Sequence, residues 1–346
     1  MTDWTPLLLT DPSPNLRRIV LTELLEKPQN DPEVVEVTLN REEDPLVKQL
    51  IANQQDDGSW TPGVIEGSYH RNSFQVTSDV LRRLAFLGFT KDHATVRSAA
   101  EYLFSHQQED GSWPILVSRA EADGYGTYTA IPLQTALPLG SVATCGYSTD
   151  HRSEKAYDWL LTQRLEDGSW PTGVTQTTVK GFRAGYRKIP HSRWGCRSNT
   201  TAAVLCFAHH PTRRHDEATR LAMDLLLGCV NTERDTFGFE VARLVGAEVT
   251  RGYLTYHAKL DLLLLLDLAG RTGISDVDPR FSNLLRMVQD WRTKHGTWEY
   301  LPKPQASRWV TLETLRALKR AKGDEKWVGK EPITPYKKYS RLERRF

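Results

Sequence analysis

The chain has 346 residues, of which 39% are hydrophobic and 25% charged, the balance of a globular protein with a buried core. Its 45 basic and 43 acidic side chains leave a net charge of +2, so we expect no general attraction for nucleic acid and only local anion preference. The four cysteines form no CxxC pair and no disulfide framework, which is typical of a reducing compartment.

The first 18 residues, MTDWTPLLLTDPSPNLRR, have acidic and proline residues where a signal peptide needs a basic start and a longer apolar run. The most apolar stretch, residues 260–269, contains two aspartates and falls short of the ~20 residues of a membrane-spanning helix. We therefore expect a cytoplasmic protein in which residues 260–269 form a buried helix.

A predicted pair of capping helices covers about residues 15–53, and a short sequence element then recurs along the chain. It is QQDDGSW at residues 54–60, QQEDGSW at 107–113 and QRLEDGSW at 163–170, with turn glycines 53 and 57 residues apart. Two weaker copies, at residues 237–240 and 295–299, keep the glycine and an aromatic residue. Each copy predicts a helix end, a tight Asp-Gly turn and a tryptophan packed under the helix.

Two kinds of helix are predicted around these turns. Amphipathic stretches such as residues 96–108 and 153–164 have one charged face and are interpreted as outer helices. Stretches with less charge are interpreted as inner helices buried on both faces: residues 73–88, 129–146, 198–210, 253–270 and 307–320. This makes five or six helical hairpins in an all-α fold with strands nearly absent.

The repeated element resembles the QW motif of squalene–hopene cyclases and related terpene cyclases, over about residues 45–325. Helical hairpins can also stack as an open solenoid. The resemblance implies instead a closed α/α toroid, here a single domain of residues 1–328 followed by a basic tail of residues 329–346. It also implies that the Gln, Asp and Trp of the motif are structural.

In such a toroid the parallel inner helices bring their N-termini to one mouth of a central cavity, where an anionic group is favoured. A basic segment precedes the third inner helix. We expect it to bind a diphosphate or carboxylate head group, and the alternative is a solvated basic loop. The residues are Lys180, Arg183, Arg187, Lys188, His191, Arg193, Trp194 and Arg197.

Class II terpene cyclases protonate an alkene with a D-x-D-D-T-A motif, and the similar segment here, RSNTTA at residues 197–202, has no carboxylate. Asp79, Asp261 and Glu313 each fall on a predicted inner helix. A buried carboxyl must pair with a base or face the cavity, so each is either a salt bridge or a catalytic acid.

The chain also resembles the β subunit of protein prenyltransferases, in which an Asp, a Cys and a distant His bind zinc. The stretch WGCRS at residues 194–198 matches the Cys with Cys196, and Tyr256-His257 matches the His. A tryptophan occupies the Asp position, so the zinc site is incomplete unless Asp261, one helical turn after His257, compensates. The alternatives are a metal-free acid/base pair of His257 and Asp261, or a core Cys and a core His.

Aromatic residues at the starts of the inner helices are expected to line the mouth and to contact a prenyl chain or a carbocation, unless they simply fill the funnel. They are Tyr69, His70, Tyr125, Tyr128, Tyr256 and Trp309.

The function expected from the resemblance is that of an enzyme acting on an isoprenoid or similarly apolar molecule. Its reaction is acid-initiated cyclisation or isomerisation, or prenyl transfer, with zinc, or magnesium bound to a diphosphate substrate, as the candidate cofactors. The competing hypothesis is a toroid without catalytic acids that binds a lipid or another protein. The basic tail is expected to lie over the toroid, or to contact a membrane surface or a partner.

Overall fold

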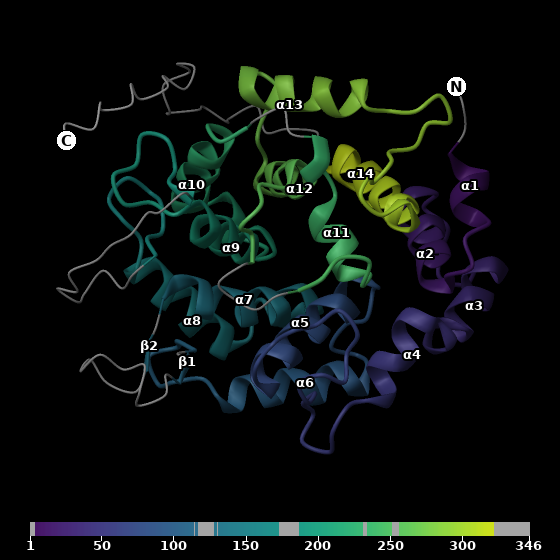
Figure 1. Ribbon diagram of the computed structural model, residues 1–346, viewed down its shortest axis with the longest axis horizontal. Helices are drawn as coiled ribbons and strands as arrows, with labels where there is room; N and C mark the ends of the chain where they lie inside the picture. The colour runs from purple at the N-terminus through teal and green to yellow at the C-terminus, as the bar shows by residue number, and fades with distance from the viewer. Residues whose placement is uncertain are drawn as a thin grey trace, which may run out of the picture.

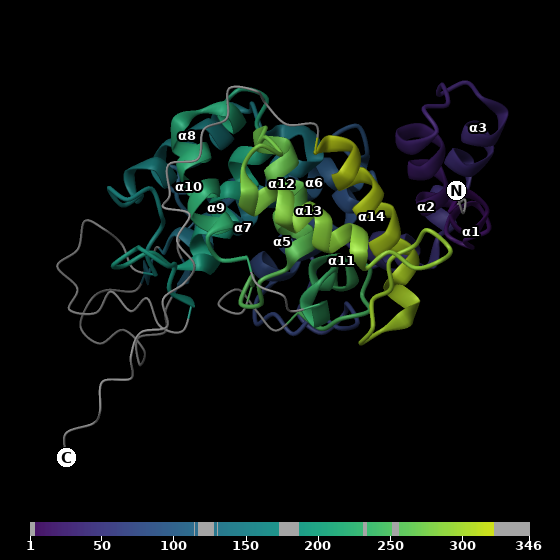
Figure 2. The ribbon, with the colours of Figure 1, turned by 90° about the horizontal axis from the view of Figure 1, so that it is seen from above.

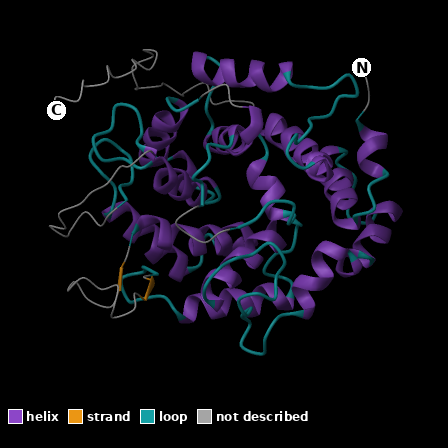
Figure 3. Ribbon diagram, in the orientation of Figure 1, coloured by secondary structure: helices purple, strands orange, loops and turns teal. Residues whose placement is uncertain are grey.

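The computed structural model describes residues 4–113, 115–116, 128–129, 131–172, 187–230, 234–250 and 256–321. Nearly all regular structure in these ranges is helical (Figure 3). The two strands found there, β1 (Ile115–Leu116) and β2 (Tyr128–Thr129), form one short antiparallel pair. The helices are α1 (Thr5–Leu9), α2 (Pro14–Ile19), α3 (Pro32–Leu39), α4 (Pro45–Ala52), α5 (Ser73–Phe86), α6 (Ala94–Ser105), α7 (Pro132–Val142), α8 (His151–Thr162), α9 (Arg197–Ala208), α10 (Glu217–Leu227), α11 (Phe239–Leu244), α12 (Leu262–Thr272), α13 (Pro279–Asp290) and α14 (Ser307–Arg320).

The helices form a closed ring with two layers (Figure 1). In the inner layer α5, α7, α9, α12 and α14 pack each against the next, and the short helix α11 contacts both α14 and α5. In the outer layer α6 packs against α5 and α13 against α12, whereas α8 packs against both α7 and α9, and α10 against both α9 and α12. The predicted all-α toroid of helical hairpins is therefore confirmed.

The N-terminal helices lie beside the ring between its last and first inner helices (Figure 2). Helix α4 contacts α5, and a π-helical turn, Val20–Leu24, contacts α14. The N-terminal helices thus pack against both the first and the last inner helix, α5 and α14, on the outside of the ring.

The burial pattern follows the predicted division into inner and outer helices. Every residue of α7 is buried, and so is every residue of α9 except Arg197. In α6, by contrast, the buried residues recur at helical spacing along one face only. None of the described helices has the length and apolarity needed to cross a membrane.

The tryptophans of the repeated element bind each outer helix to its inner partner. Each Trp indole N–H donates to the carbonyl ten residues earlier, at 2.6–2.8 Å, and each Trp backbone N–H donates to a threonine hydroxyl on an inner helix, at 2.9–3.1 Å. The pairs are Trp60–Thr77, Trp113–Thr135, Trp170–Thr200 and Trp298–Thr311.

The glutamines of the first two copies link neighbouring repeats, because Gln54 and Gln107 each donate to a carbonyl at the start of the next outer helix. In the third copy the register differs from the prediction. There Arg164, not Gln163, holds the equivalent position and donates to the turn carbonyl of Gly168 at 3.2 Å.

One predicted inner helix is shorter than expected. Residues 253–270 were predicted to be helical, but α12 begins only at Leu262, with Asp261 as its N-cap. His257 precedes the helix and has a positive φ of 50°, a conformation that interrupts a right-handed helix. The physical reason is capping, since the Asp261 carboxyl accepts the N–H of Leu263 and so defines the first turn.

Candidate functional site

A central cavity of about 270 Å³ lies within the ring, towards the C-terminal ends of the inner helices. Its apolar wall includes Phe86 of α5, Leu205 of α9, and Val241 and Leu244 of α11. The remaining wall is strongly polar. It includes four arginines (Arg82, Arg271, Arg316 and Arg320), four carboxyl groups (Glu240, Asp261, Asp267 and Glu313) and His209.

The cavity continues into a wider hollow of about 660 Å³, since Arg271, Arg316 and Arg320 line both. This hollow also contains Arg214 and Lys319, so its rim is basic. It lies at the C-terminal ends of α12 and α14, where cationic side chains complement the helix dipoles. The basic hollow therefore lies at the C-terminal ends of inner helices, whereas the sequence analysis expected the positive charge at their N-terminal ends.

The predicted head-group segment lies elsewhere. His191, Arg193 and Trp194 are exposed, and the Arg193 guanidinium lies 5.0 Å from the centre of the Trp194 ring. Arg197 is half-buried and donates to the carbonyl of Ala258 at 2.7 Å. Neither they nor Arg187 line the two hollows, and Lys180 and Arg183 lie outside the described residues.

Asp261 and Glu240 are adjacent carboxyl groups in the cavity wall. The Asp261 carboxylate accepts backbone N–H groups from Gly238 at 2.9 Å, Glu240 at 2.7 Å and Leu263 at 2.9 Å. These bonds attach the start of α11 to the start of α12. Both carboxyl groups therefore face the cavity from a backbone that is held in place.

The two carboxyl groups have opposite pKa shifts. Burial raises the pKa of Asp261 to about 6; its three backbone donors act against burial, whereas the charge of Glu240 adds to it. Burial also acts to raise the pKa of Glu240, but the Arg243 guanidinium and His257 outweigh it and hold that pKa below its ordinary value. Such a divergence within one pair distinguishes a proton donor from a permanently charged neighbour.

His257 is not paired with Asp261 as the sequence suggested. Its ring is buried, and its Nδ1 lies 3.3 Å from Oε1 of Glu240 without the alignment of a hydrogen bond. Burial lowers the pKa of His257 and outweighs the neighbouring Glu240 carboxylate, which acts to raise it. The correction follows from the late start of α12, which removes the helical spacing between residues 257 and 261.

Asp79 and Glu313 form ion pairs. The Asp79 carboxylate lies 3.3 Å from Nε of Arg83 and 3.8 Å from Nε2 of His70, and it accepts the Tyr256 hydroxyl. Burial acts to raise the pKa of Asp79, but Arg83 and His70 outweigh burial and lower it. Glu313, which does line the cavity, accepts from Arg316 at 2.8 Å and from Arg320 at 3.2 Å. For both residues the geometry favours the salt-bridge alternative.

The predicted mouth aromatics whose side chains the structure describes, Tyr69, His70, Tyr256 and Trp309, do not line the cavity. Tyr69 is 67% exposed, whereas the rings of His70 and Tyr256 stack 6.2 Å apart in the buried cluster around Asp79. Trp309 is buried against Phe86, with ring centres 5.6 Å apart, and so supports the one phenylalanine that lines the cavity. Tyr125 and the side chain of Tyr128 are outside the described residues.

The residues predicted to bind zinc come from neighbouring segments. Cys196 is buried as the N-cap of α9, and two residues later the Ser198 hydroxyl donates to the carbonyl of His257 at 2.9 Å. In the part of the chain that the structure describes, no three His, Cys, Asp or Glu side chains are grouped to hold a metal ion. Zinc and magnesium stay predictions.

Comparison with known proteins points to one family. Residues 33–188 match the family model of the squalene-hopene cyclase C-terminal domain. A squalene–hopene cyclase of Zymomonas mobilis is 28% identical over 126 residues, 36% of this chain and 18% of that protein. That of Bradyrhizobium diazoefficiens is 28% identical over 139 residues, 39% of this chain and 20% of that protein. Over this part of its length the chain is similar to the squalene–hopene cyclases.

This squalene–hopene cyclase-like chain matches only about a fifth of the length of either relative. A crystal structure of a protein from Actinoplanes superposes with a TM-score of 0.45 at 18% identity, covering 88% of this chain and 89% of that one. A type II terpene cyclase from Scytonema, in complex with geranylgeranyl dihydroxybenzoate, gives a TM-score of 0.33 at 15% identity, covering 80% and 95%. The fold assignment rests on the helix packing and not on these superpositions.

The squalene–hopene cyclase-like chain uses its RSNTTA segment for packing. Asn199 accepts the N–H of Leu133 at 2.7 Å, and Thr200 accepts that of Trp170 at 3.0 Å. The residues that resemble the acid motif are therefore occupied in joining α9 to its neighbours.

Of the charged residues that line the cavity, the sequence predicted only Asp261 and Glu313 as site residues; Glu240, Arg82 and His209 are among those that it missed. Glu240 belongs to the weak fourth repeat, FGFE at residues 237–240, which was interpreted only as a turn. Arg82 is part of an Arg-Arg pair in an otherwise charge-poor inner helix, which was a usable signal. His209 follows the end of α9 and carries no local signal.

Proposed function

We propose that the chain is a squalene–hopene cyclase-like enzyme that binds a short isoprenoid, or a similarly apolar small molecule, in its central cavity. Asp261 donates the proton that starts cyclisation or isomerisation. The observation that supports this role is the pair formed by Asp261 and Glu240, because opposite pKa shifts separate a proton donor from a charged neighbour.

Each group around the pair has a role in this chemistry. Proton transfer from Asp261 to a carbon–carbon double bond creates a carbocation, and the final loss of a proton from the product restores the acid. The Glu240 carboxylate and the face of Phe86 stabilise positive charge inside the cavity. The volume of about 270 Å³ lies just below the ~300–1,000 Å³ typical of small-molecule sites, which favours a short isoprenoid over squalene.

The test is the Asp261→Asn variant, incubated with geranyl, farnesyl and geranylgeranyl substrates as diphosphates and alcohols. Asparagine keeps an acceptor oxygen and is a good N-cap, so α12 is retained while the acidic proton is lost. We expect product formation to fall by ~10²–10⁴-fold, measured by gas chromatography with mass spectrometry. The matched control is Asp276→Asn, an exposed aspartate in the turn between α12 and α13. Undiminished product formation by Asp261→Asn would remove the proposed acid.

A second candidate function is binding without turnover. It is favoured by the three hydrogen bonds that Asp261 accepts from backbone N–H groups. These bonds stabilise the ionised form of Asp261, which cannot donate a proton. In that case the wild-type protein retains an isoprenoid in native mass spectrometry but converts none of the substrates above. Conversion by the wild type would exclude this alternative.

A further inference from the structure

Arg82 differs from every other arginine of the cavity. It lies on α5, lines the cavity and is only 6% exposed. Within the described ranges it forms no ion pair with a carboxylate and donates no hydrogen bond. The next residue, Arg83, instead pairs with Asp79.

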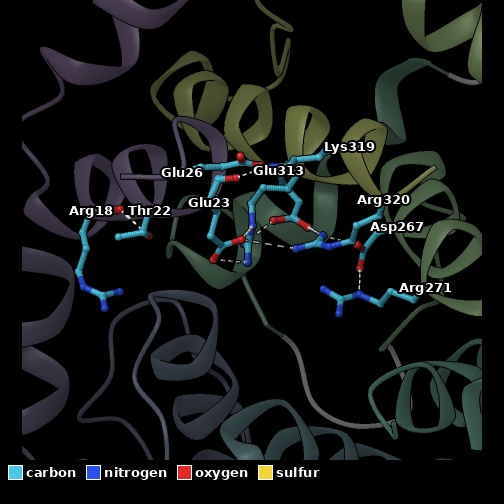
Figure 4. A network of polar contacts seen from close by, with 10 residues as sticks. Arg18, Thr22, Glu23, Glu26, Asp267, Arg271, Glu313, Lys319 and Arg320 are labelled. Atoms are coloured by element: carbon cyan, nitrogen blue, oxygen red, sulfur yellow. Dashed lines mark hydrogen bonds and ion pairs between the residues drawn. The ribbon is translucent and has the colours of Figure 1, made fainter. Parts of the chain in front are cut away.

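The other three arginines of the cavity wall are neutralised by carboxylates. Arg271 donates to Asp267 at 2.7 Å, Arg316 to Glu313 at 2.8 Å, and Arg320 to both carboxylates (Figure 4). Arg271 and Arg320 also lie in the last turns of their helices, where they complement the dipole. Neither explanation applies to Arg82, which is unpaired and precedes the last turn of α5.

An unpaired guanidinium is costly to bury, so its retention indicates a partner that enters from outside. Arg82 is close enough for its charge to act on Glu240, His257 and His209. The positive charge of Arg82 therefore contributes to the electrostatic potential inside the cavity, where Glu240 and His209 also lie. A planar guanidinium matches a small oxyanion, because two parallel N–H groups bind two oxygens of one carboxylate or phosphate.

We propose that Arg82 is an oxyanion subsite, and that the ligand of the cavity is an amphipathic molecule with one carboxylate or phosphate head and an apolar tail. This assignment rests on the proposed function for the tail, which lies along Phe86, Val241 and Leu244. The basic outer hollow favours the entry of such an anion, since it holds Arg214 and Lys319 besides the three shared arginines.

The test compares the binding of geraniol, geranic acid and geranyl phosphate by isothermal titration calorimetry. We expect wild-type protein to bind at least one of the two anions ten or more times more tightly than the alcohol. Arg82→Met removes this preference, and Arg82→Lys restores part of it. Because Arg82→Met removes an uncompensated buried charge, its melting temperature without ligand equals or exceeds that of the wild type.

Arg214→Met is the matched control, because it removes the same charge from the rim of the outer hollow and leaves the cavity intact. It retains the preference for anions. Equal binding of the three ligands by wild-type protein would overturn the subsite, as would an equal loss of preference in Arg214→Met. Inorganic phosphate that binds as tightly as geranyl phosphate would assign the subsite to a free ion and overturn the amphipathic ligand. No readout requires turnover, so loss of the catalytic proposal leaves this one intact.

Discussion

Asp261 combines a structural and a chemical property in one buried carboxyl group. Its oxygens accept backbone N–H groups from the first turn of α12 and the start of α11, while its burial disfavours the charged form and raises its pKa. The folded protein therefore keeps the proton up to about pH 6, whereas the unfolded chain loses it near the ordinary value of 3.8. Between these pH values the folded state binds more protons than the unfolded state.

This difference predicts a pH dependence of stability. The favourable contribution of protonated Asp261 is fully present below pH 3.8 and is lost as the pH rises through 6. Asp261→Asn has no such titration. We therefore expect the free energy of unfolding of the variant minus that of wild type to increase by ~3 kcal/mol between pH 3.5 and pH 8. Urea denaturation at a series of pH values measures this difference. A difference between Asp261→Asn and wild type that does not change with pH would contradict the raised pKa.

Individual site residues were predictable only in part. Asp79, Asp261 and Glu313 were recognised as buried carboxyls that need a partner or a cavity, because each falls in a charge-poor stretch. Which partner each one finds depends on distant segments. Tyr256 reaches Asp79 from 177 residues away, and Glu240 contacts His257 through the fold rather than along a helix. Local spacing contains no information about such pairs.

At the level of elements, the repeats made most of the ring predictable. The helix of residues 307–320 was predicted with the bounds that α14 has, and the Asp-Gly turns mark the ends of the outer helices. The prediction of helix was wrong at residues 256–261, and this error has a physical cause. Their composition suits a buried helix, but capping by Asp261 and packing of the preceding segment decide where α12 starts.

The turn glycines have a role that composition alone does not show. Gly111 has a φ of 90°, and a Cβ atom there would lie 2.4 Å from the carbonyl oxygen of Lys155 on the next outer helix. Gly63 has a similar φ of 86°, but nothing lies within 4 Å of its Cβ position. Both positions impose backbone strain on any other residue, but only Gly111 also needs the absence of a Cβ atom for the close packing of neighbouring repeats.

Substitution by alanine at these glycines measures the two effects. Gly63→Ala lowers the free energy of unfolding by about 1 kcal/mol, the cost of a left-handed conformation. Gly111→Ala lowers it by about 3 kcal/mol or more, because the neighbouring repeat must also move. Urea denaturation of both variants measures the difference. Equal losses would mean that the repeats are not in close contact at this turn.

Charged side chains of α14, the last helix in the described part of the chain, close the ring. Arg316 of α14 donates to Glu23 at 2.8 Å, and Lys319 pairs with Glu26, which joins α14 to the N-terminal unit. Arg320 reaches in the other direction, to Asp267 of α12 (Figure 4). The beginning and the end of the described chain are therefore connected through one network that also lines the cavity.

Breaking this network weakens the ring as a unit. Arg320→Met leaves Asp267 and Glu313, whose side chains are 9% and 10% exposed, with one cationic partner each. We expect the free energy of unfolding to fall by about 2–3 kcal/mol, because two mostly buried carboxylates each lose one of their cationic partners.

The control is Arg308→Met. The Arg308 side chain is 44% exposed and pairs with Asp11 at 3.1 Å, so its removal costs at most about 1 kcal/mol. Thermal and urea unfolding in 0.05 and 0.5 M salt distinguish the two, since salt weakens the exposed pair and spares the buried one. Equal losses for the two variants would show that the network contributes no more to closure than a surface ion pair.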